Sequence, residues 1–185
     1  MFRSSDRGRF LSAHRMAMDA VFIALHVVLS LFSIYILGDQ IKLSFASFPL
    51  LVASLLFGMA DGVLVAGIGE FLYQMLFYSF GPTTLLWMLP PMLHALIVGL
   101  YSQRHGLNLS LKQTAGIVFA AGLVTALFTT VVLYIDAQFW GYPSGLTGLV
   151  IVFRFVNSLI MCTIYTIVAP RTVALLRRVA RPKAA

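Results

Sequence analysis

Long apolar stretches are the feature that most constrains the fold of this sequence. Residues 17–37 are predominantly apolar, and a helix rising about 1.5 Å per residue needs about 20 such residues to cross the bilayer core. The preceding segment, MFRSSDRGRFLSAHR, is similar to the start of a secretion signal, but the apolar run is too long and no A-x-A site follows it. We therefore predict a membrane-spanning helix rather than a cleaved leader.

The rest of the chain repeats this pattern between breaks at Gly, Pro and charged residues. Hydrophobic residues make up 60% of the sequence and charged residues 10%, whereas about a quarter of an average soluble domain is charged. We predict an all-α integral membrane protein, a bundle of six transmembrane helices with a tight turn at FGMADG between the second and third. The expected spans are residues 17–37, 43–58, 60–80, 84–101, 114–135 and 146–170.

The basic residues indicate the orientation of the bundle. Most of them fall on one side of the predicted membrane, and the positive-inside rule then makes both termini cytoplasmic. The expected organisation is a basic tail at 1–16, a six-helix transmembrane domain at 17–170 and a second basic tail at 171–185. Basic tails beside an anionic leaflet also account for the net charge of +7 without nucleic acid. The cytoplasmic set is Arg3, Arg7, Arg9, Arg15, Arg104, Lys112, Arg171, Arg177, Arg178, Arg181 and Lys183.

Four polar residues inside the apolar runs require an explanation. Glu70 lies near the middle of the third run, and Gln74 follows one helical turn later on the same face. Arg154 falls at a comparable depth in the sixth run, with Asn157 one turn away. A guanidinium at the centre of a membrane helix costs about 2.5–3.5 kcal/mol, so it needs a partner or a wet cavity. Either Glu70 and Arg154 form a static ion pair, or they line a pocket in which Arg154 holds a carboxylate or polar ring edge and Glu70 accepts N–H donors. Both arrangements can also hold in turn, with the charges paired in the empty protein and bound to the ligand in the full one.

Histidines and aromatic residues extend this candidate site. His94 follows two consecutive prolines, which remove amide donors and predict a broken helix that forms a pocket wall. His26 stands alone in the first run and is interpreted as a packed, hydrogen-bonded residue. Trp140 and Tyr142 lie in an expected outer loop, residues 136–145. They form either an interfacial aromatic belt or a lid that stacks on a planar ligand.

Motifs for catalysis and metal binding are missing from the sequence. YPSGLTG has Tyr142 where a nucleophile elbow requires glycine, and the sequence contains no H-E-x-x-H, P-loop or G-x-G-x-x-G pattern. The single cysteine, Cys162, has no Cys or His neighbour at metal-ligand spacing. We therefore expect neither an enzyme nor a metal or cofactor site, and any energy source must lie in another protein.

Four alanines recur at close spacing near the first run. Small residues four positions apart permit close backbone contact between helices in lipid. The pattern serves either packing within the bundle or docking of a partner helix. The residues are Ala13, Ala17, Ala20 and Ala24.

Three stretches carry a resemblance to a known family: AVFIALHVVLS, IKLSFASFPLLVASLLFG and GVLVAGIGEFL. Over about residues 17–101 they resemble the S component, the substrate-binding subunit, of energy-coupling factor (ECF) vitamin transporters. The second stretch is most similar to the folate-type branch. Two segments depart from that branch: GEFLYQ stands in place of an Asp followed by Leu-Leu-Gly, and FYSFGPTT replaces a Phe-Pro-Gly segment.

The resemblance implies a small six-span protein of the bacterial cytoplasmic membrane that captures a water-soluble vitamin from outside. Uptake would then be driven by two ATPase subunits through a transmembrane scaffold (T) subunit, which Ala20 and Ala24 would face. A competing interpretation is an MreD-like structural protein of a cell-shape complex, which needs no solute pocket. A small membrane enzyme using Glu70 and His94 is a third interpretation, supported by no motif.

Overall fold

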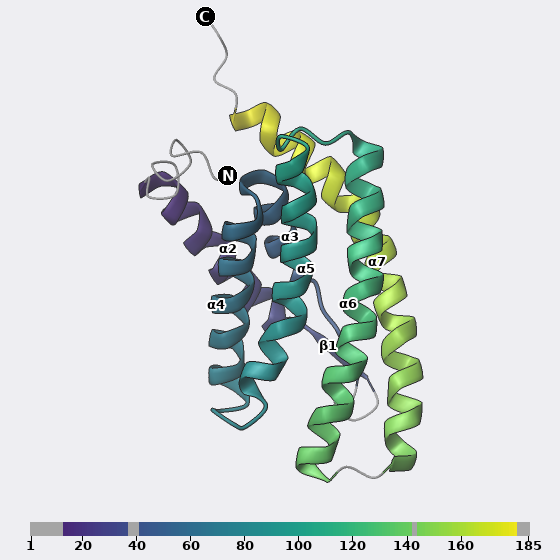
Figure 1. Cartoon of the computed structure of the whole chain (residues 1–185). Helices are drawn as coiled ribbons and strands as arrows, with labels where there is room; N and C mark the ends of the chain where they lie inside the picture. Colours follow the sequence, from purple (N-terminus) through teal and green to yellow (C-terminus); the bar gives the residue numbers. More distant parts are fainter. Residues whose placement is uncertain (1–12, 37–40, 142–143, 181–185) are drawn as a thin grey trace, which may run out of the picture.

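The computed structural model describes residues 13–36, 41–141 and 144–180. The helices lie alongside one another, and the start of α2 and the end of α7 both lie in the upper half of Figure 1. In the described part there are six helices and two short strands. They are α2 (Ala13–Leu31), β1 (Ile34–Ile36), β2 (Ile41–Leu43), α3 (Ser47–Phe57), α4 (Met59–Phe77), α5 (Thr84–Arg104), α6 (Leu111–Trp140) and α7 (Ser144–Ala180).

Helix length supports four of the predicted transmembrane spans. Among residues 13–36, 41–141 and 144–180, four segments are long and apolar enough to cross a membrane, and the count of six is not confirmed. At 11 residues, α3 extends only about 16 Å, about half of the hydrocarbon core. The polar first half of α2 contains Arg15 and Asp19, and α2 is not among the four. The four segments are Met59–Phe77, Thr84–Arg104, Leu111–Trp140 and Ile151–Arg177.

A short β-hairpin between α2 and α3 interrupts the otherwise all-helical bundle. The first helix was expected to continue to residue 37, but α2 ends at Leu31. The strands pair antiparallel, with Ile34 opposite Leu43 and Ile36 opposite Ile41. Isoleucine is β-branched and favours extended backbone, and strand pairing satisfies the backbone groups that a broken helix would leave open.

The short helix α3 forms the centre of the bundle. Four of its leucine and alanine side chains, at positions 50, 51, 53 and 55, have no exposed surface. It packs against α2, α4, α5 and α7, so it is enclosed by helices rather than by lipid. A helix too short to span a membrane is stable there because its polar ends meet protein groups.

The FGMADG motif predicts the turn between α3 and α4. It does not predict the hydrogen bonds that join this turn to α2, α5 and α7. Gly58 makes the turn with φ +101°, a conformation that favours glycine. The Leu55 carbonyl just before it accepts hydrogen bonds from Ser102 Oγ of α5 (3.1 Å) and Arg177 Nη2 of α7 (3.0 Å). On the α2 side, Arg15 donates to the Phe57 carbonyl (2.8 Å). We call this region, built around residues 55–62, the tied end of the bundle.

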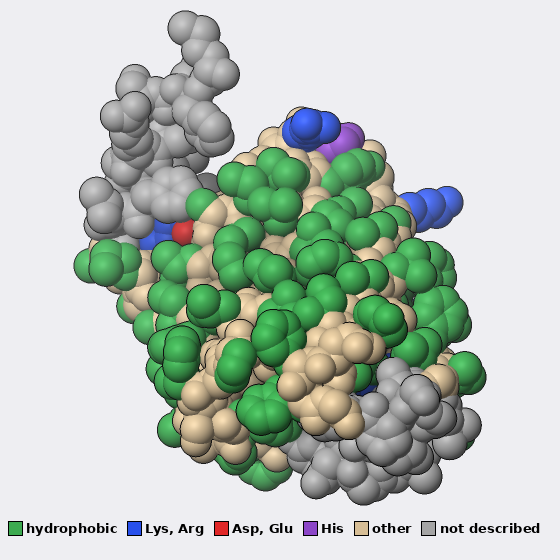
Figure 2. Space-filling view, turned by 60° about the horizontal axis from the view of Figure 1, so that its bottom comes forward, with side chains coloured by type: hydrophobic (Ala, Val, Ile, Leu, Met, Phe, Trp, Pro, Cys, Tyr) green, Lys and Arg blue, Asp and Glu red, His purple; other side chains and the backbone are tan. Residues whose placement is uncertain are grey.

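The outer surface is largely apolar. Large hydrophobic side chains such as Leu76, Leu127 and Val152 are exposed on α4, α6 and α7. In Figure 2 hydrophobic side chains spread across the face of the molecule, while Lys and Arg side chains lie near its edges. Such a surface is unusual for a soluble monomer and agrees with the expected integral membrane protein.

Candidate functional site

A cavity of about 850 Å³ lies at the opposite end of the bundle from the tied end. Its wall is built by the last turns of α2 and α4, the loop 78–83, the first half of α5, the second half of α6, one described residue of α7 and the segment that follows β2. A cavity of this size at the meeting point of several helices is typical of a small-molecule site. Its polar wall residues fall into three groups, described below.

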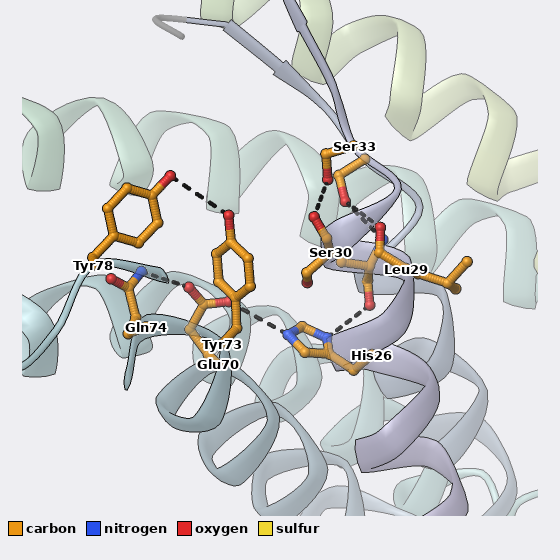
Figure 3. A network of polar contacts seen from close by, with 10 residues as sticks. His26, Leu29, Ser30, Ser33, Glu70, Tyr73, Gln74 and Tyr78 are labelled. Carbon is orange, nitrogen blue, oxygen red and sulfur yellow. Dashed lines mark hydrogen bonds and ion pairs between the residues drawn. The ribbon is translucent and has the colours of Figure 1, made fainter. Parts of the chain in front are cut away.

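Glu70 is the centre of the first group (Figure 3). It projects from α4, and its Oε1 accepts a hydrogen bond from Gln74 Nε2 at 2.8 Å. Its Oε2 lies 3.4 Å from Nε2 of His26 on α2. His26 Nδ1 in turn lies 2.8 Å from the Ala46 carbonyl oxygen. The four residues form a chain of contacts that joins α4, α2 and the start of α3.

The proton positions in this chain follow from its acceptors. A carbonyl oxygen can only accept, so Nδ1 of His26 carries a proton and donates it to Ala46. Nε2 would then face the Glu70 carboxylate as a bare lone pair, which is repulsive unless a further proton lies between them. The Glu70–His26 contact is therefore attractive when the pair holds one additional proton, on either partner.

Arg154 and Trp87 form the second group. The guanidinium carbon of Arg154, on α7, lies 5.4 Å from the ring centroid of Trp87 on α5, which is a cation–π distance. Both residues line the cavity. The static ion pair between Glu70 and Arg154 is not what the structure shows, since Glu70 contacts Gln74 and His26 instead. The pocket interpretation is retained, because both charged residues line the same cavity.

His94 and Asp136 form the third group. His94 on α5 is 5% exposed, and Asp136 on α6 is 6% exposed. Both line the cavity. His94 Nε2 and Asp136 Oδ1 are buried without a hydrogen-bond partner in the described part of the chain.

The prolines before His94 do not break the helix. Pro90 and Pro91 lie inside a continuous α5, and both line the cavity together with His94. Because proline has no amide hydrogen, the carbonyls of Leu86 and Trp87 lose their helical donors. Such carbonyls are tolerated at membrane depth where they face protein or a cavity, so the expectation of a pocket wall holds without a break.

The remaining predicted site residues divide into three cases. Trp140 lines the cavity and is 56% exposed, and its Nε1 donates to Thr83 Oγ1 at 3.4 Å. Asn157 is not among the described residues that line the cavity. Tyr142 lies outside the described residues.

Several residues of the cavity wall were not predicted as site residues, among them His26, Trp87 and Asp136. His26 is packed and hydrogen-bonded as predicted, but it also lines the cavity, and Trp87 was not considered. Asp136 was placed in a loop at 136–145, but α6 continues to Trp140 and ends at Gly141, which has φ +66°. The spacing of four residues from Val132 and Leu133 to Asp136 and Ala137 is that of one helix face. All four side chains are buried on this face of α6.

The predicted small-residue stripe lies on the surface of α2. Its four alanines, at positions 13, 17, 20 and 24, are all exposed. They are therefore not used for packing inside the described bundle.

Cys162 is buried, and its Sγ lies 3.3 Å from the Phe119 carbonyl oxygen. Among the described residues, no group of three His, Cys, Asp or Glu could hold a metal ion.

Comparison with known proteins identifies a family and a solved structure that match this architecture. A family model described as ECF transporter, substrate-specific component, matches residues 14–173. Among solved structures, the chain is similar to the S component of a bacterial ECF transporter, with 20% identity and a TM-score of 0.58 over 90% of this chain and 95% of that chain. At this identity the similarity concerns the fold. No curated protein matches the sequence.

Proposed function

We propose that this chain, which belongs to the family of ECF transporter substrate-specific components, captures a water-soluble vitamin or related micronutrient. Capture takes place on the outside of the bacterial cytoplasmic membrane, with both termini, and the basic tails at 1–16 and 171–185, cytoplasmic. The observation that carries the proposal is a cavity of about 850 Å³ whose wall holds both Glu70 and Arg154. Ionisable groups at membrane depth are costly, and they mark functional sites such as substrate or ion pathways.

The cavity supports specific roles for its residues. Arg154, lying over Trp87, suits a carboxylate or polar ring edge of the solute. Glu70, held by Gln74 and His26, suits N–H donors. Trp140 at the exposed rim suits stacking on a planar ring, and Tyr142 and Asn157 remain proposed contacts on the adjoining segments. Folate is the first candidate, because the second-helix pattern resembles the folate-type branch.

Energy for uptake comes from other subunits in this proposal. Membership of the family implies association with a transmembrane scaffold subunit and two ATPase subunits, and the chain itself has no ATP-binding motif. The exposed stripe of Ala13, Ala17, Ala20 and Ala24 suits close approach of a scaffold helix. The protein is then a binding subunit and not an enzyme.

The alternative of an MreD-like structural protein is not favoured. The family match covers residues 14–173, and a structural protein gains nothing from a large cavity with charged walls. Binding of a radiolabelled panel of water-soluble vitamins to the purified protein in lipid nanodiscs separates the two functions. Tight binding of one compound without chemical turnover supports capture, whereas binding of none contradicts it.

Gly69→Ala is expected to lower ligand affinity about tenfold while the protein remains folded. A Cβ at Gly69 would lie 2.8 Å from Cδ2 of the His26 ring, so the ring must shift and its contact with Glu70 lengthens. Loss of one hydrogen bond to a charged group accounts for about a tenfold change. Calorimetric titration with the ligand identified in the panel measures the effect.

The matched control is Gly67→Ala on the same helix. Its Cβ would meet only the flexible Met92 side chain, at 3.5 Å or more, so affinity should be unchanged. Equal affinities of the Gly69→Ala and Gly67→Ala variants would show that the position of the His26 ring does not affect binding.

Ala20→Leu is expected to leave ligand affinity unchanged and to reduce ATP-dependent uptake about tenfold, the effect of truncating or blocking one important interface contact. A leucine on the exposed stripe keeps a scaffold helix at a distance but does not reach the cavity. Uptake by the complete transporter in proteoliposomes gives the rate. Ala120→Leu, at an exposed alanine of α6, is the control and should spare both activities; a normal rate for Ala20→Leu would remove the stripe from the docking surface.

A further inference from the structure

Asp136 differs from Asp61 and Glu70, two other carboxylates of the described bundle. Asp61, 2% exposed, forms an ion pair with Arg15. Glu70 is held by Gln74 and His26. Asp136 is 6% exposed, yet it makes no hydrogen bond or ion pair within residues 13–36, 41–141 and 144–180, and its Oδ1 is buried without a partner.

A buried carboxylate without a partner is unfavourable in the empty protein. It has lost hydration and has gained no donor in exchange. In Asp136 this group forms part of the cavity wall, so a solute in the cavity can reach it. A second buried polar atom on the same wall, His94 Nε2, is also without a partner. The cavity therefore contains a carboxylate oxygen, Asp136 Oδ1, and an imidazole nitrogen, His94 Nε2, whose hydrogen-bond partners have to come from the bound solute.

We propose that Asp136 is a ligand-binding residue that accepts N–H donors from a basic nitrogen of the captured solute, such as an ammonium, amidine or amino-substituted ring nitrogen. An ionised carboxylate is acceptor-only, and its two oxygens match two parallel N–H donors. A cationic donor also compensates the charge that burial leaves unsolvated. The inference rests on the proposed function and narrows its substrate class to solutes that contain such a nitrogen.

Arg154 adds a second chemical requirement for this solute. Its guanidinium, on the same wall, suits an acceptor group, while Asp136 suits a donor group. The bound solute then carries both a basic nitrogen and an oxygen acceptor. Folate, with its amino-substituted pterin ring and its carboxylates, belongs to this class, whereas an acid without a basic nitrogen does not.

Asp136→Asn tests the residue, with Asp61→Asn as the matched control. Both changes replace a buried aspartate by an amide of the same shape. In the ligand-free protein, Asp136→Asn should leave the unfolding midpoint unchanged or raise it by about 2 °C or more, because an unpaired charge is removed. Asp61→Asn should lower the midpoint, because it breaks the pair with Arg15. A lower midpoint for Asp136→Asn would show that the carboxylate stabilises the fold, and would overturn the proposal.

Affinity selection tests the ligand class. Wild-type and Asp136→Asn proteins in nanodiscs are incubated with one mixture that contains folate, thiamine, pyridoxamine, pyridoxine, pantothenate and lipoate, and retained compounds are identified by mass spectrometry. We expect the wild type to retain compounds with a basic nitrogen, and Asp136→Asn to bind them about 30-fold or more weakly. Asp61→Asn should retain the wild-type set.

The outcomes separate this inference from the proposed function. Retention of pantothenate or lipoate alone by the wild type would refute the basic-nitrogen class but leave solute capture intact. Equal retention by wild type and Asp136→Asn would remove Asp136 from the site. A wild type that retains nothing would refute capture and, with it, the ligand class.

Discussion

Glu70→Ala reduces ligand affinity by about 100-fold or more, because truncating one partner of a hydrogen-bonded charge pair with the solute costs about 2–5 kcal/mol. Glu70 contacts both Gln74 and His26, so its removal leaves two further polar side chains in the cavity wall without their partner. The change also removes the carboxylate proposed to accept N–H donors of the solute. Equilibrium binding of the ligand to the variant in nanodiscs measures the loss.

Two comparisons make this result specific. Leu72→Ala shortens an exposed side chain on the same helix and should bind as the parent does. Glu70→Gln keeps an acceptor for Gln74 but loses the charge, and an intermediate affinity is expected. If Glu70→Ala unfolds at a lower temperature but binds with parental affinity, the network around Glu70 supports the fold alone.

Gly99→Ala is expected to destabilise the protein by about 3 kcal/mol, at the upper end of the usual cost of overpacking. A Cβ at Gly99 would contact the Met59 Cα and lie 2.6 Å from the Met59 backbone nitrogen. These are backbone atoms at the start of α4, so no side-chain rotation can relieve the clash. The helices α4 and α5 must then separate at the tied end. Unfolding in a denaturing detergent, followed by circular dichroism, measures the change.

The control for this prediction is Gly116→Ala on α6. No heavy atom lies within 4 Å of the Cβ position at Gly116, and alanine is the better helix former by about 1 kcal/mol. Its stability should equal or slightly exceed that of the parent. A Gly99→Ala protein as stable as the parent would show that α4 and α5 do not approach as closely as the structure shows.

The sequence predicts the long helices well, for a physical reason. The spans expected at 60–80, 84–101 and 114–135 correspond to α4, α5 and α6, because apolar runs of such length in lipid must satisfy their backbone groups internally. The same reasoning fails between α2 and α3. There the segment IYI is as apolar as the helix before it, and hydropathy does not distinguish a strand from a helix.

The cavity lining was predicted in part, whereas binding of a solute by these residues remains a prediction. Glu70, Gln74, His94, Trp140 and Arg154 line the cavity as expected, because a costly polar group inside an apolar run indicates a wet or paired environment. Sequence gives the depth of each residue along its helix but not the neighbouring helix that it faces. That is why the contact of Glu70 with His26, rather than with Arg154, could not be foreseen.

The Leu55 carbonyl accepts hydrogen bonds from both Ser102 and Arg177, and this affects where the bundle opens locally. It joins α3, α5 and α7 at the end remote from the cavity, so thermal opening is resisted there and is easier near the rim. Amide protons in the final turn of α4 should exchange with deuterium before those of α3. A solute then enters and leaves by local opening at the cavity end, while the tied end of the bundle stays closed.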